Sequence, residues 1–484
     1  MAQSKTKSAI LLSFSQNLNL VLSIVGSAIL ARLFTQSDLG IYKQTIMIFD
    51  LISPFVLLSI PEALYYFLPK GESNKTIFNT FILVTISGII TFSAMFLGRF
   101  FFSNQFNNPE LVNTLKIYAL FAIFYFPLQI LSPIFIVLEK ATLMAIWAVC
   151  SNFIMIITVI ISTILTQNYY IVLFARVVVQ LIICSVGIII IYKLTKTKKQ
   201  DLVLDIKIIR KVLKYALPLG LTTLIGTLCV RLDKMVVSMF VTPDEFAVYN
   251  NGAMEIPFIN TVVGSISAVI FVEYVTLYDK SEFDKIVELF KTCAYKTALF
   301  LFPVMVYFLF WNKEFIITLY SDKYLKSAVP FFIYLFAIPV RIVQYGPVIQ
   351  AMNKNYLLVL RSIFDLLVNL ICNFIFVHFF GMNGAAIATI VVLYIWHVPF
   401  NLIVISKGLK TKILHLFPIK KLLMIFSISM LIVISSLFFK KFELLPIIKL
   451  FISTLYCIII YLPILFFYDR KTFLSLTKLF GRNK

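Results

Sequence analysis

Charged residues are scarce in this sequence. They make up 13% of 484 residues, against about 25% in an ordinary soluble domain. Apolar residues make up 61%, and the mean hydropathy is +0.96. A soluble protein of this composition could not cover its surface with polar groups. The scarcity therefore excludes a soluble cytoplasmic enzyme, a secreted disulfide-stabilised domain and a disordered chain. It predicts an integral membrane protein that crosses the bilayer many times.

Cysteine pairs and the sequence motifs of soluble enzymes are lacking as well. The six cysteines lie singly within apolar stretches, with no C-x-x-C pair and no Cys/His cluster. This pattern indicates neither a disulfide framework nor a zinc site. The sequence contains no G-x-x-x-x-G-K-[S/T], G-x-S-x-G, H-E-x-x-H or G-x-G-x-x-G motif. We therefore expect no enzymatic activity, no ATP hydrolysis by this chain and no cofactor other than a coupling ion.

Long apolar stretches are what the sequence has instead. A helix needs roughly 20 apolar residues to cross the hydrocarbon core of a bilayer. Stretches of this kind cover approximately residues 9–33, 43–67, 77–102, 111–138, 142–166, 169–192, 215–241, 247–277, 293–310, 328–352, 356–380, 383–406, 421–439 and 445–468. We expect an all-α integral membrane protein with about fourteen transmembrane helices.

Basic residues are distributed unequally between the two sides of this predicted bundle. With the N-terminus placed in the cytoplasm, 27 Lys and Arg residues fall in inner segments, 9 fall in outer loops and 7 fall within spans. Cytoplasmic loops of membrane proteins carry the excess of Lys and Arg. Both termini and the basic segment 193–214 are therefore predicted to be cytoplasmic. The loops account for the net charge of +21, so no nucleic-acid partner is expected.

An internal repeat divides the chain. TQSDLGIY at residues 35–42 matches TPDEFAVY at residues 242–249, and each copy lies between two predicted spans. The offset predicts two six-helix lobes related by a parallel repeat, an arrangement typical of secondary transporters. The expected divisions are an N-terminal lobe at 1–192, a basic cytoplasmic linker at 193–214, a C-terminal lobe at 215–406, and two extra helices with a basic tail at 407–484.

The first span of each predicted lobe carries a polar stripe. In the span 215–241, one helical face contains Thr223, Thr227, Arg231, Lys234 and Ser238, with Asp233 beside it. The first span of the chain has an uncharged counterpart that includes Gln16 and Asn19. Charged residues at mid-span cost about 2.5–3.5 kcal/mol each on insertion scales, so they usually face a cavity or a partner. Pairing of Arg231 with Asp233, and bonding of the hydroxyls to their own backbone, is the structural alternative.

A second polar stripe lies in the span 356–380. Its members, four residues apart, are Arg361, Asp365, Asn369 and Asn373. The alternatives are a site for a cation or a proton at Asp365 and Asn369, or a local Arg361–Asp365 ion pair with amides packed against neighbouring helices. The remaining deep polar residues include Asp50, Arg176, Glu255, Arg341, and the histidines His378 and His397, for which we expect simple packing.

Three segments resemble signatures of Wzx-type O-antigen and capsular polysaccharide flippases. They are ARLFTQSDLGIY at 31–42, RLDK at 231–234 followed by PDE and Tyr249, and GMNGAAIAT at 381–389. The resemblance extends from about residue 9 to 406. The same superfamily contains the multidrug and toxin extrusion (MATE) transporters and the peptidoglycan-precursor flippases. The resemblance implies two six-helix lobes in a V-shaped, MATE-like bundle that opens alternately to each side, with two additional C-terminal helices.

The resemblance also implies a cargo. It is an oligosaccharide repeat unit on undecaprenyl pyrophosphate, moved from the cytoplasmic to the outer leaflet of the bacterial cytoplasmic (inner) membrane for O-antigen, capsule or exopolysaccharide synthesis. A cleft lined with cations would replace the water lost around the pyrophosphate. The residues that we expect around the pyrophosphate and sugars are Arg231, Lys234, Arg341, Arg176, Gln16 and Asn19. Expected partners are membrane lipids and the polymerase and chain-length proteins of the same pathway.

Energy coupling is implied by the resemblance too. In relatives, a sodium site or a protonatable acid in the second lobe supplies it, and the comparable positions here are Asp233, Asp365, Asn369 and Thr389. These residues carry carboxylate, amide and hydroxyl oxygens, which hard cations such as Na⁺ prefer. The order of the Asp365–Asn369 pair is reversed relative to relatives, so H⁺ coupling through Asp233 or Asp365 is an alternative to Na⁺.

Other classes of membrane protein are less consistent with the sequence. A cation-coupled multidrug exporter would share the fold, but the two extra helices and the Arg/Lys stripe argue against it. A membrane-embedded polysaccharide polymerase or ligase generally needs a long extracytoplasmic loop, and the longest outer segment predicted here is about 311–327. A passive channel is disfavoured because no pore signature is present.

Overall fold

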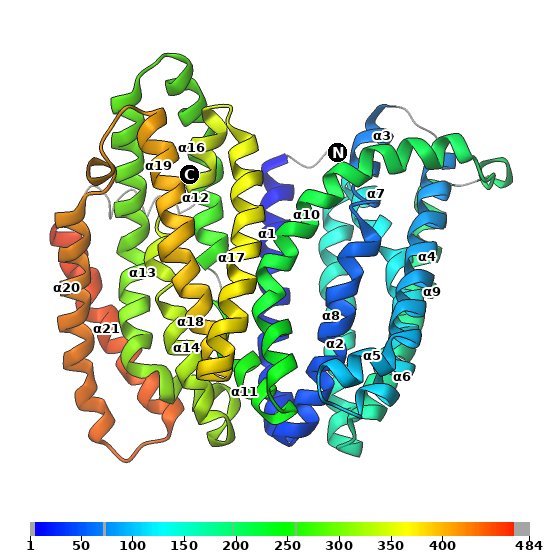
Figure 1. The fold of residues 1–484 in the computed structure, drawn as a ribbon, viewed down its shortest axis with the longest axis horizontal. Helices are drawn as coiled ribbons and strands as arrows, with labels where there is room; N and C mark the ends of the chain where they lie inside the picture. Colours follow the sequence, from blue (N-terminus) through cyan, green and yellow to red (C-terminus); the bar gives the residue numbers. More distant parts are fainter. Residues whose placement is uncertain (1–4, 71–73, 197, 257–258, 469–484) are drawn as a thin grey trace. The chain divides into compact units, whose positions relative to one another are not determined.

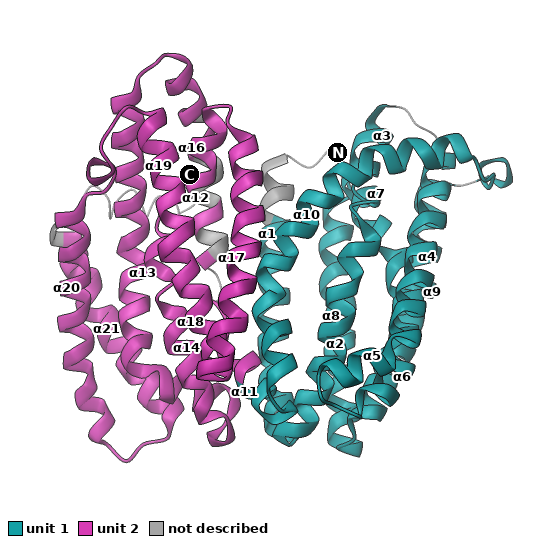
Figure 2. Cartoon of the chain, in the orientation of Figure 1, with its two compact units in different colours: residues 1–248 teal, residues 249–484 magenta. Residues whose placement is uncertain are grey.

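The computed structural model describes residues 5–70, 74–196, 198–256 and 259–468, and all regular secondary structure within these ranges is helical (Figure 1). The chain forms two compact units, residues 1–248 and residues 249–484 (Figure 2). Residues 1–4 and the basic tail 469–484, both predicted to be cytoplasmic, lie outside the described residues.

The described part of unit 1 contains ten helices and the beginning of an eleventh, together with three short 3₁₀ segments. Its elements are α1 (Lys5–Leu33), α2 (Gln36–Leu57), α3 (Ala63–Phe67), η1 (Leu68–Lys70), α4 (Asn74–Leu97), α5 (Arg99–Gln105), α6 (Leu111–Tyr125), η2 (Phe126–Ile130), α7 (Leu131–Val137), α8 (Ala141–Thr166), α9 (Tyr169–Thr195), η3 (Lys199–Asp201), α10 (Ile206–Phe240) and α11 (Pro243–Gly252), which continues into unit 2.

Unit 2 contains the remaining elements. They are α12 (Ile259–Asp279), α13 (Phe283–Tyr320), η4 (Asp322–Ser327), α14 (Ala328–Leu335), α15 (Ile338–Arg341), α16 (Tyr345–Ala351), α17 (Asn355–Phe380), α18 (Met382–Val392), the π-helical turn η5 (Leu393–His397), α19 (Val398–Gly408), η6 (Ile413–Leu416), α20 (Ile419–Ser436), η7 (Leu437–Lys441) and α21 (Pro446–Tyr468).

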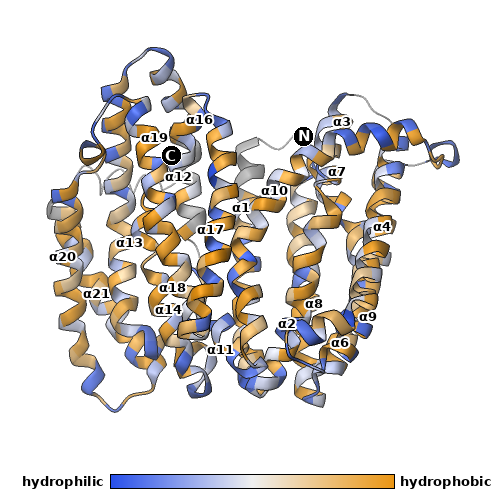
Figure 3. Cartoon of the chain, in the orientation of Figure 1, coloured by the Kyte–Doolittle hydropathy of each residue, from blue (hydrophilic) through white to orange (hydrophobic). Residues whose placement is uncertain are grey.

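Most of the predicted spans appear as single long helices. Twelve helical segments in the described residues are long and apolar enough to cross a membrane, and each overlaps a predicted stretch, with ends that differ by up to ten residues. A thirteenth candidate is a pair of segments, Asp322–Leu335 and Ile338–Ala351, bent by 42° at the position of the expected span 328–352. Helix α12 overlaps the second half of the expected span 247–277, of which residues 257 and 258 are outside the described part. Apolar residues dominate the middle of these helices (Figure 3). The chain is therefore a multi-pass, all-α membrane protein, as the composition predicts.

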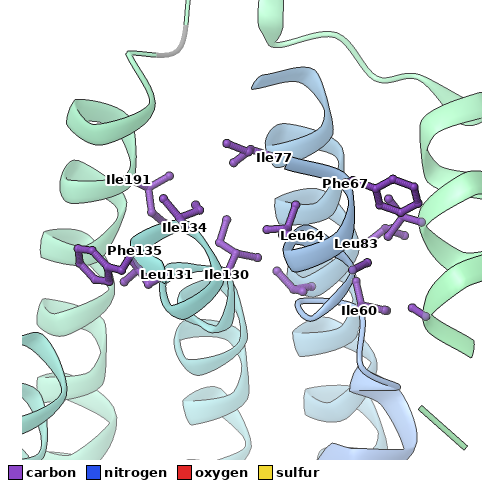
Figure 4. Close-up of a cluster of buried hydrophobic side chains, with 14 residues drawn as sticks. Ile60, Leu64, Phe67, Ile77, Leu83, Ile130, Leu131, Ile134, Phe135 and Ile191 are labelled. Carbon is purple, nitrogen blue, oxygen red and sulfur yellow. The ribbon is translucent and has the colours of Figure 1, made fainter. Parts of the chain in front are cut away.

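The core of unit 1 joins helices from distant parts of the sequence. Buried side chains of α3, α4, η2 with α7, α9 and α10 form one apolar cluster, part of which is labelled in Figure 4. Val212 and Ala216 bring the beginning of α10 into this cluster. The basic segment 193–214, expected as a linker, thus ends in a helix that packs on the N-terminal unit. The lobe boundaries expected from the repeat stay a prediction, because the division into two compact units does not show whether the two halves repeat the same arrangement of helices.

The two copies of the repeated motif meet inside unit 1. A Cβ atom on Gly40, in the first copy, would lie 1.9 Å from the carbonyl oxygen of Pro243, in the second copy. Only glycine permits this approach of the two backbones. A second close approach follows at Gly220, where a Cβ atom would lie 2.4 Å from the carbonyl oxygen of Leu58. Close backbone contacts at two glycines therefore hold the beginning of α2 against the start of α11 and the end of α2 against α10.

The GMNGAAIAT segment forms the tight turn between α17 and α18. Gly381 has a φ of +58°, a conformation that disfavours side chains. At Gly384 a Cβ atom would lie 1.9 Å from the carbonyl oxygen of Phe376, so α18 starts in direct contact with the backbone of α17. The motif thus has a structural reason: it reverses the chain and lets the two helices approach closely.

The two additional C-terminal helices, α20 and α21, pack on α13. Tyr307 donates to or accepts from the Ser453 hydroxyl at 2.8 Å, and the indole nitrogen of Trp311 donates to the Ser436 hydroxyl at 3.1 Å. Buried Val306 and Val433 complete the contact. These helices are attached to unit 2 by a specific interface of aromatic and hydroxyl groups.

Candidate substrate-binding and ion-coupling sites

A cavity of about 370 Å³ lies within unit 1. Its walls come from α6, η2 and α7 on one side and from α8 and α9 on the other. Pro127 and Pro133 interrupt the α6–α7 stretch, because proline lacks the N–H that continues a helix, and a 3₁₀ segment separates the two helices. The lining residues are Phe121, Tyr125, Leu128, Gln129, Leu131, Ser132, Phe135, Met144, Trp147, Ala148, Ser151, Asn152, Met155, Arg176, Gln180 and Ile183.

Arg176 is the charged residue of this cavity. Its Nη1 donates a hydrogen bond of 2.9 Å to the Tyr42 hydroxyl, and its guanidinium carbon lies 6.0, 5.8 and 5.6 Å from the ring centroids of Tyr42, Tyr118 and Phe121. The Nε atom is buried and has no hydrogen-bond partner in the described part of the chain. No carboxylate of the described residues forms an ion pair with it. Aromatic faces therefore stabilise this cation, and its charge is left uncompensated.

Uncharged polar groups surround the rest of the cavity. Asn152 donates to the backbone oxygen of Asn19 at 3.3 Å and to its side-chain oxygen at 3.2 Å. Gln180 donates to the Phe124 carbonyl at 3.2 Å. The structure thus brings two predicted site residues to one place, because Asn19 binds a residue of the cavity that Arg176 lines. Gln16, by contrast, is exposed on α1.

Arg231 has a different partner from the one considered from sequence. It forms an ion pair of 2.6 Å with Asp50 on α2, and both side chains are about two-fifths exposed, 37% and 38%. Pairing with the neighbouring Asp233 was therefore the wrong structural alternative for Arg231. Asp233 is buried, and its Oδ1 accepts a hydrogen bond of 2.7 Å from the backbone nitrogen of Lys234.

Some hydroxyls of the α10 stripe bond to the backbone of their own helix, as the structural alternative predicts, and others do not. The Thr227 hydroxyl donates to the Thr223 carbonyl at 2.9 Å, within its own helix. Ser238 instead accepts a hydrogen bond of 2.9 Å from the Gln44 amide of α2, and Asn108 donates to the same glutamine at 2.6 Å. This buried chain of polar groups ties α10 to α2 near Gly40.

In unit 2, Arg341 pairs with Glu255. Its Nη2 donates to a Glu255 carboxylate oxygen, while its Nε is buried without a hydrogen-bond partner among the described residues. Both partners are about one-third to two-fifths exposed. Arg341 lies at the end of α15, beside the 42° bend between the two halves of this interrupted span. The predicted cargo cation of this span is therefore already paired in this structure.

Asp365 is at the centre of a polar cluster at mid-span. Its Oδ2 lies 3.3 Å from Arg361 Nε and 3.0 Å from His397 Nδ1, and its Oδ1 is buried without a hydrogen-bond partner in the described residues. Arg361 also donates to Asn401 at 3.1 Å, and Asn401 donates to the His397 carbonyl at 2.8 Å. The local Arg361–Asp365 pair predicted as the structural alternative is present, and a histidine joins it.

The other predicted coupling residues make different contacts. Asn369 accepts a hydrogen bond of 2.9 Å from Asn373 at its backbone oxygen, and Thr389 is half-buried on α18. The described residues contain no group of three or more His, Cys, Asp or Glu side chains placed to hold a metal ion. The set of four draws Asp233 from unit 1 and the other three residues from unit 2, so a shared ion site stays a prediction.

The cavity and the two-unit helical fold agree with comparisons to known proteins. The model of a family described as polysaccharide biosynthesis protein matches residues 6–271, more than half of the chain. The chain belongs to the polysaccharide biosynthesis protein family. The match includes the repeated motif, the α2–α10 contact and every residue of the unit 1 cavity. No curated protein matches the sequence.

Solved structures show the same fold. The lipid II flippase MurJ, in an inward closed conformation, is similar with a TM-score of 0.71 at 19% identity, over 95% of this chain and 99% of that one. An inward-facing multidrug resistance transporter of the MATE family has a TM-score of 0.62 at 14% identity, over 81% and 96% of the two chains. A MOP-superfamily transporter from Pyrococcus furiosus has a TM-score of 0.57 at 11% identity, over 85% and 98%. The predicted fold class is confirmed.

Sequence reasoning missed two parts of these sites. His397 was expected only to pack, but it lies 3.0 Å from Asp365, at the end of the π-helical turn η5. Asn152 and Gln180 escaped notice because each is a single amide in an apolar helix. Gln180 is one helical turn from Arg176 on α9, so its spacing could have suggested a shared face. Asn152 joins them only through the packing of α8 against α9.

Proposed function

We propose that the polysaccharide biosynthesis family member described here is a flippase for undecaprenyl-pyrophosphate-linked oligosaccharides. It would carry repeat units from the cytoplasmic to the outer leaflet of a bacterial cytoplasmic membrane, for O-antigen, capsule or another surface polysaccharide. The polyprenyl chain can remain in the bilayer during transport. The pyrophosphate and sugars cannot, because they would lose their hydration in the hydrocarbon.

The observation that carries the proposal is the uncompensated charge of Arg176 in the unit 1 cavity. Arg176 is half-buried, and a cation that loses part of its hydration without gaining a carboxylate favours a bound anion. Its buried Nε is a donor without an acceptor. A phosphate oxygen would satisfy both the charge and the donor, in the charge-assisted geometry that arginine favours.

The remainder of the cavity suits a sugar attached to the phosphate. Trp147 and Phe121 offer apolar faces, and Asn152, Gln129 and Ser151 offer amide and hydroxyl groups. A volume of about 370 Å³ is in the lower part of the range for small-ligand pockets. The cavity would therefore hold the pyrophosphate with the first part of the glycan, and the rest of the repeat unit would extend outside it.

The same cavity argues against a multidrug exporter of cationic compounds. A cationic drug would have to bind beside Arg176 with no carboxylate to offset the repulsion between the two charges. A bound phosphate, in contrast, would neutralise the positive charge of Arg176.

For energy coupling we propose that Asp365 and His397 form the proton-binding site. The Asp365 carboxylate and the His397 imidazole lie 3.0 Å apart, close enough to hold one proton between them, and Arg361 contacts the same carboxylate oxygen. Protonation that weakens the Arg361–Asp365 pair would then change the packing between α17 and η5. This is the mechanical link through which a proton gradient could drive unit 2.

The test is a deletion strain in which the side of the membrane that holds the lipid-linked glycan is measured. Without the gene, the glycan lipid should accumulate where membrane-impermeant periodate cannot oxidise it. Complementation with the wild-type gene should return it to the oxidisable pool. An unchanged oxidisable fraction in the deletion strain would contradict the proposed function.

A further inference from the structure

The beginning of α10 has two chemically different faces. One face packs on the apolar cluster of unit 1 through Ile208, Ile209, Val212, Leu213 and Ala216. The opposite face carries four exposed cations at helical spacing, Lys207, Arg210, Lys211 and Lys214, which we call the basic platform. This division fixes the helix on the protein and turns all of its positive charge outward.

The basic platform lines a hollow, and three of its four cations have no ion-pair partner among the described residues. Its four cations and Ile206 surround a surface hollow of about 370 Å³. In the described part of the chain, no carboxylate forms an ion pair with Lys207, Arg210 or Lys214. The nearby Asp205 instead caps the helix, because it accepts hydrogen bonds from the backbone nitrogens of Lys207 and Ile208.

An exposed apolar run adjoins the basic platform. Leu202, Val203, Leu204 and Ile206 are 50%, 49%, 57% and 68% exposed, and we call them the apolar rim. Contiguous apolar side chains on a surface indicate contact with a membrane or another partner. Cations beside an apolar run are the pattern of helices that lie in the interface of a bilayer.

Aromatic rings mark the same level of the protein. Tyr66 of α3 stacks on Tyr215 of α10 with 4.6 Å between ring centroids, and the Lys70 ammonium lies 3.7 Å from the Tyr66 centroid. The Lys211 ammonium lies 5.0 Å from the Phe67 centroid. Tyrosines are enriched where hydrocarbon meets headgroups. Tyrosines beside the basic platform are the pattern expected at headgroup depth.

The direction and length of α10 agree with this depth. The helix has 35 residues, about 52 Å at 1.5 Å per residue, which exceeds the roughly 30 Å of a hydrocarbon core. Figure 1 shows its first turns running crosswise to the other helices of unit 1 before the helix turns along them. Pro218 lies inside α10 after these first turns, where a proline bends a helix.

We infer that the basic platform binds the phosphate headgroups of anionic phospholipids while the apolar rim inserts beside their acyl chains. This lipid site lies outside the unit 1 cavity and does not depend on which substrate the protein carries. Bound lipids would hold the first turns of α10 in the interface and leave Pro218 as the point about which the rest of the helix bends.

The test measures binding of phosphatidylglycerol to the purified full-length protein by native mass spectrometry, with phosphatidylcholine of the same acyl chains as the reference lipid. The variant combines Lys207→Gln, Arg210→Gln and Lys214→Gln. Each cation near an anionic surface contributes about a fivefold factor, so we expect phosphatidylglycerol to bind on the order of 100-fold more weakly. The side chains are exposed, so folding should be preserved, and thermal melting checks this.

The matched control removes three cations elsewhere, with Lys280→Gln, Lys285→Gln and Lys291→Gln. Among the described residues near them, no large exposed apolar side chain accompanies these cations. The control should retain phosphatidylglycerol like the wild type. Equal retention by both variants, or equal loss from both, would overturn the proposal. Complete displacement of the lipid from the wild type by millimolar inorganic phosphate would also overturn it, because the site would then be one for phosphate ions.

Discussion

Arg176→Gln separates the stability of the protein from its proposed function. Removing the guanidinium loses one hydrogen bond to Tyr42, typically about 1 kcal/mol, and contacts with three rings, each about 0.5–2 kcal/mol. It also removes the desolvation penalty of a half-buried charge that no carboxylate offsets. These contributions have opposite signs. We therefore expect the variant to melt within a few degrees of the wild type.

Binding of a polyprenyl pyrophosphate should respond very differently. A hydrogen bond to a charged group contributes about 1.5–3 kcal/mol, so losing it weakens binding by about 10- to 150-fold. Arg176→Lys keeps the charge but loses the planar fork, and should fall between the wild type and Arg176→Gln. The assay is equilibrium binding of a short-chain polyprenyl pyrophosphate to the purified protein.

The matched control is Arg99→Gln. Arg99 also lies over aromatic rings, at 4.5 Å from the centroid of Phe96 and 4.6 Å from that of Phe100, but it is not part of the cavity. It should bind the pyrophosphate like the wild type. The reasoning is refuted if Arg176→Gln binds the lipid normally, or if it melts far below the wild type because the arginine is a structural residue.

Three further outcomes are expected. Asp365→Asn and His397→Gln should each insert normally and lose the dependence of transport on an imposed proton gradient in proteoliposomes; an unchanged dependence in either would exclude that residue from coupling. Gly384→Ala should lower the stability by about 1–3 kcal/mol or more, because its Cβ would lie 1.9 Å from a backbone oxygen of α17. The control Gly346→Ala should not, because its Cβ would have no atom within 4 Å. Equal melting temperatures of the two variants would contradict the close approach at Gly384. A reporter fused after Lys214 should be active only in its cytoplasmic form, and a periplasmic signal would reverse the predicted topology.

The fold was accessible from sequence because membrane helices carry a local signal. A run of about 20 apolar residues is sufficient to locate a span, so the twelve continuous spans overlap predicted stretches. The bend between Leu335 and Ile338 was not predicted, since both halves are apolar and only their packing decides the angle. The path of α10 was missed too, because its amphipathic first turns resemble a polar loop in composition.

The sites were accessible only in part, because partners depend on tertiary contacts. Sequence spacing identified the Arg361–Asp365 pair, whose members are one turn apart on α17. It could not identify Asp50 as the partner of Arg231, since 181 positions separate them and an acid lies two residues from Arg231 in the chain. Arg176 was recognised as a deep cation, but the cavity around it exists only through the packing of α6–α7 against α8 and α9.

Flipping by the purified protein tests the central claim most directly. The protein is reconstituted in liposomes with a fluorescent, undecaprenyl-pyrophosphate-linked glycan, and the fraction that a membrane-impermeant reagent can modify is followed over time. The account predicts that wild-type protein moves the lipid across the bilayer, faster with a proton gradient, and that Arg176→Gln slows this movement at equal protein content. Movement no faster than in protein-free liposomes, with folded wild-type protein present, would contradict it.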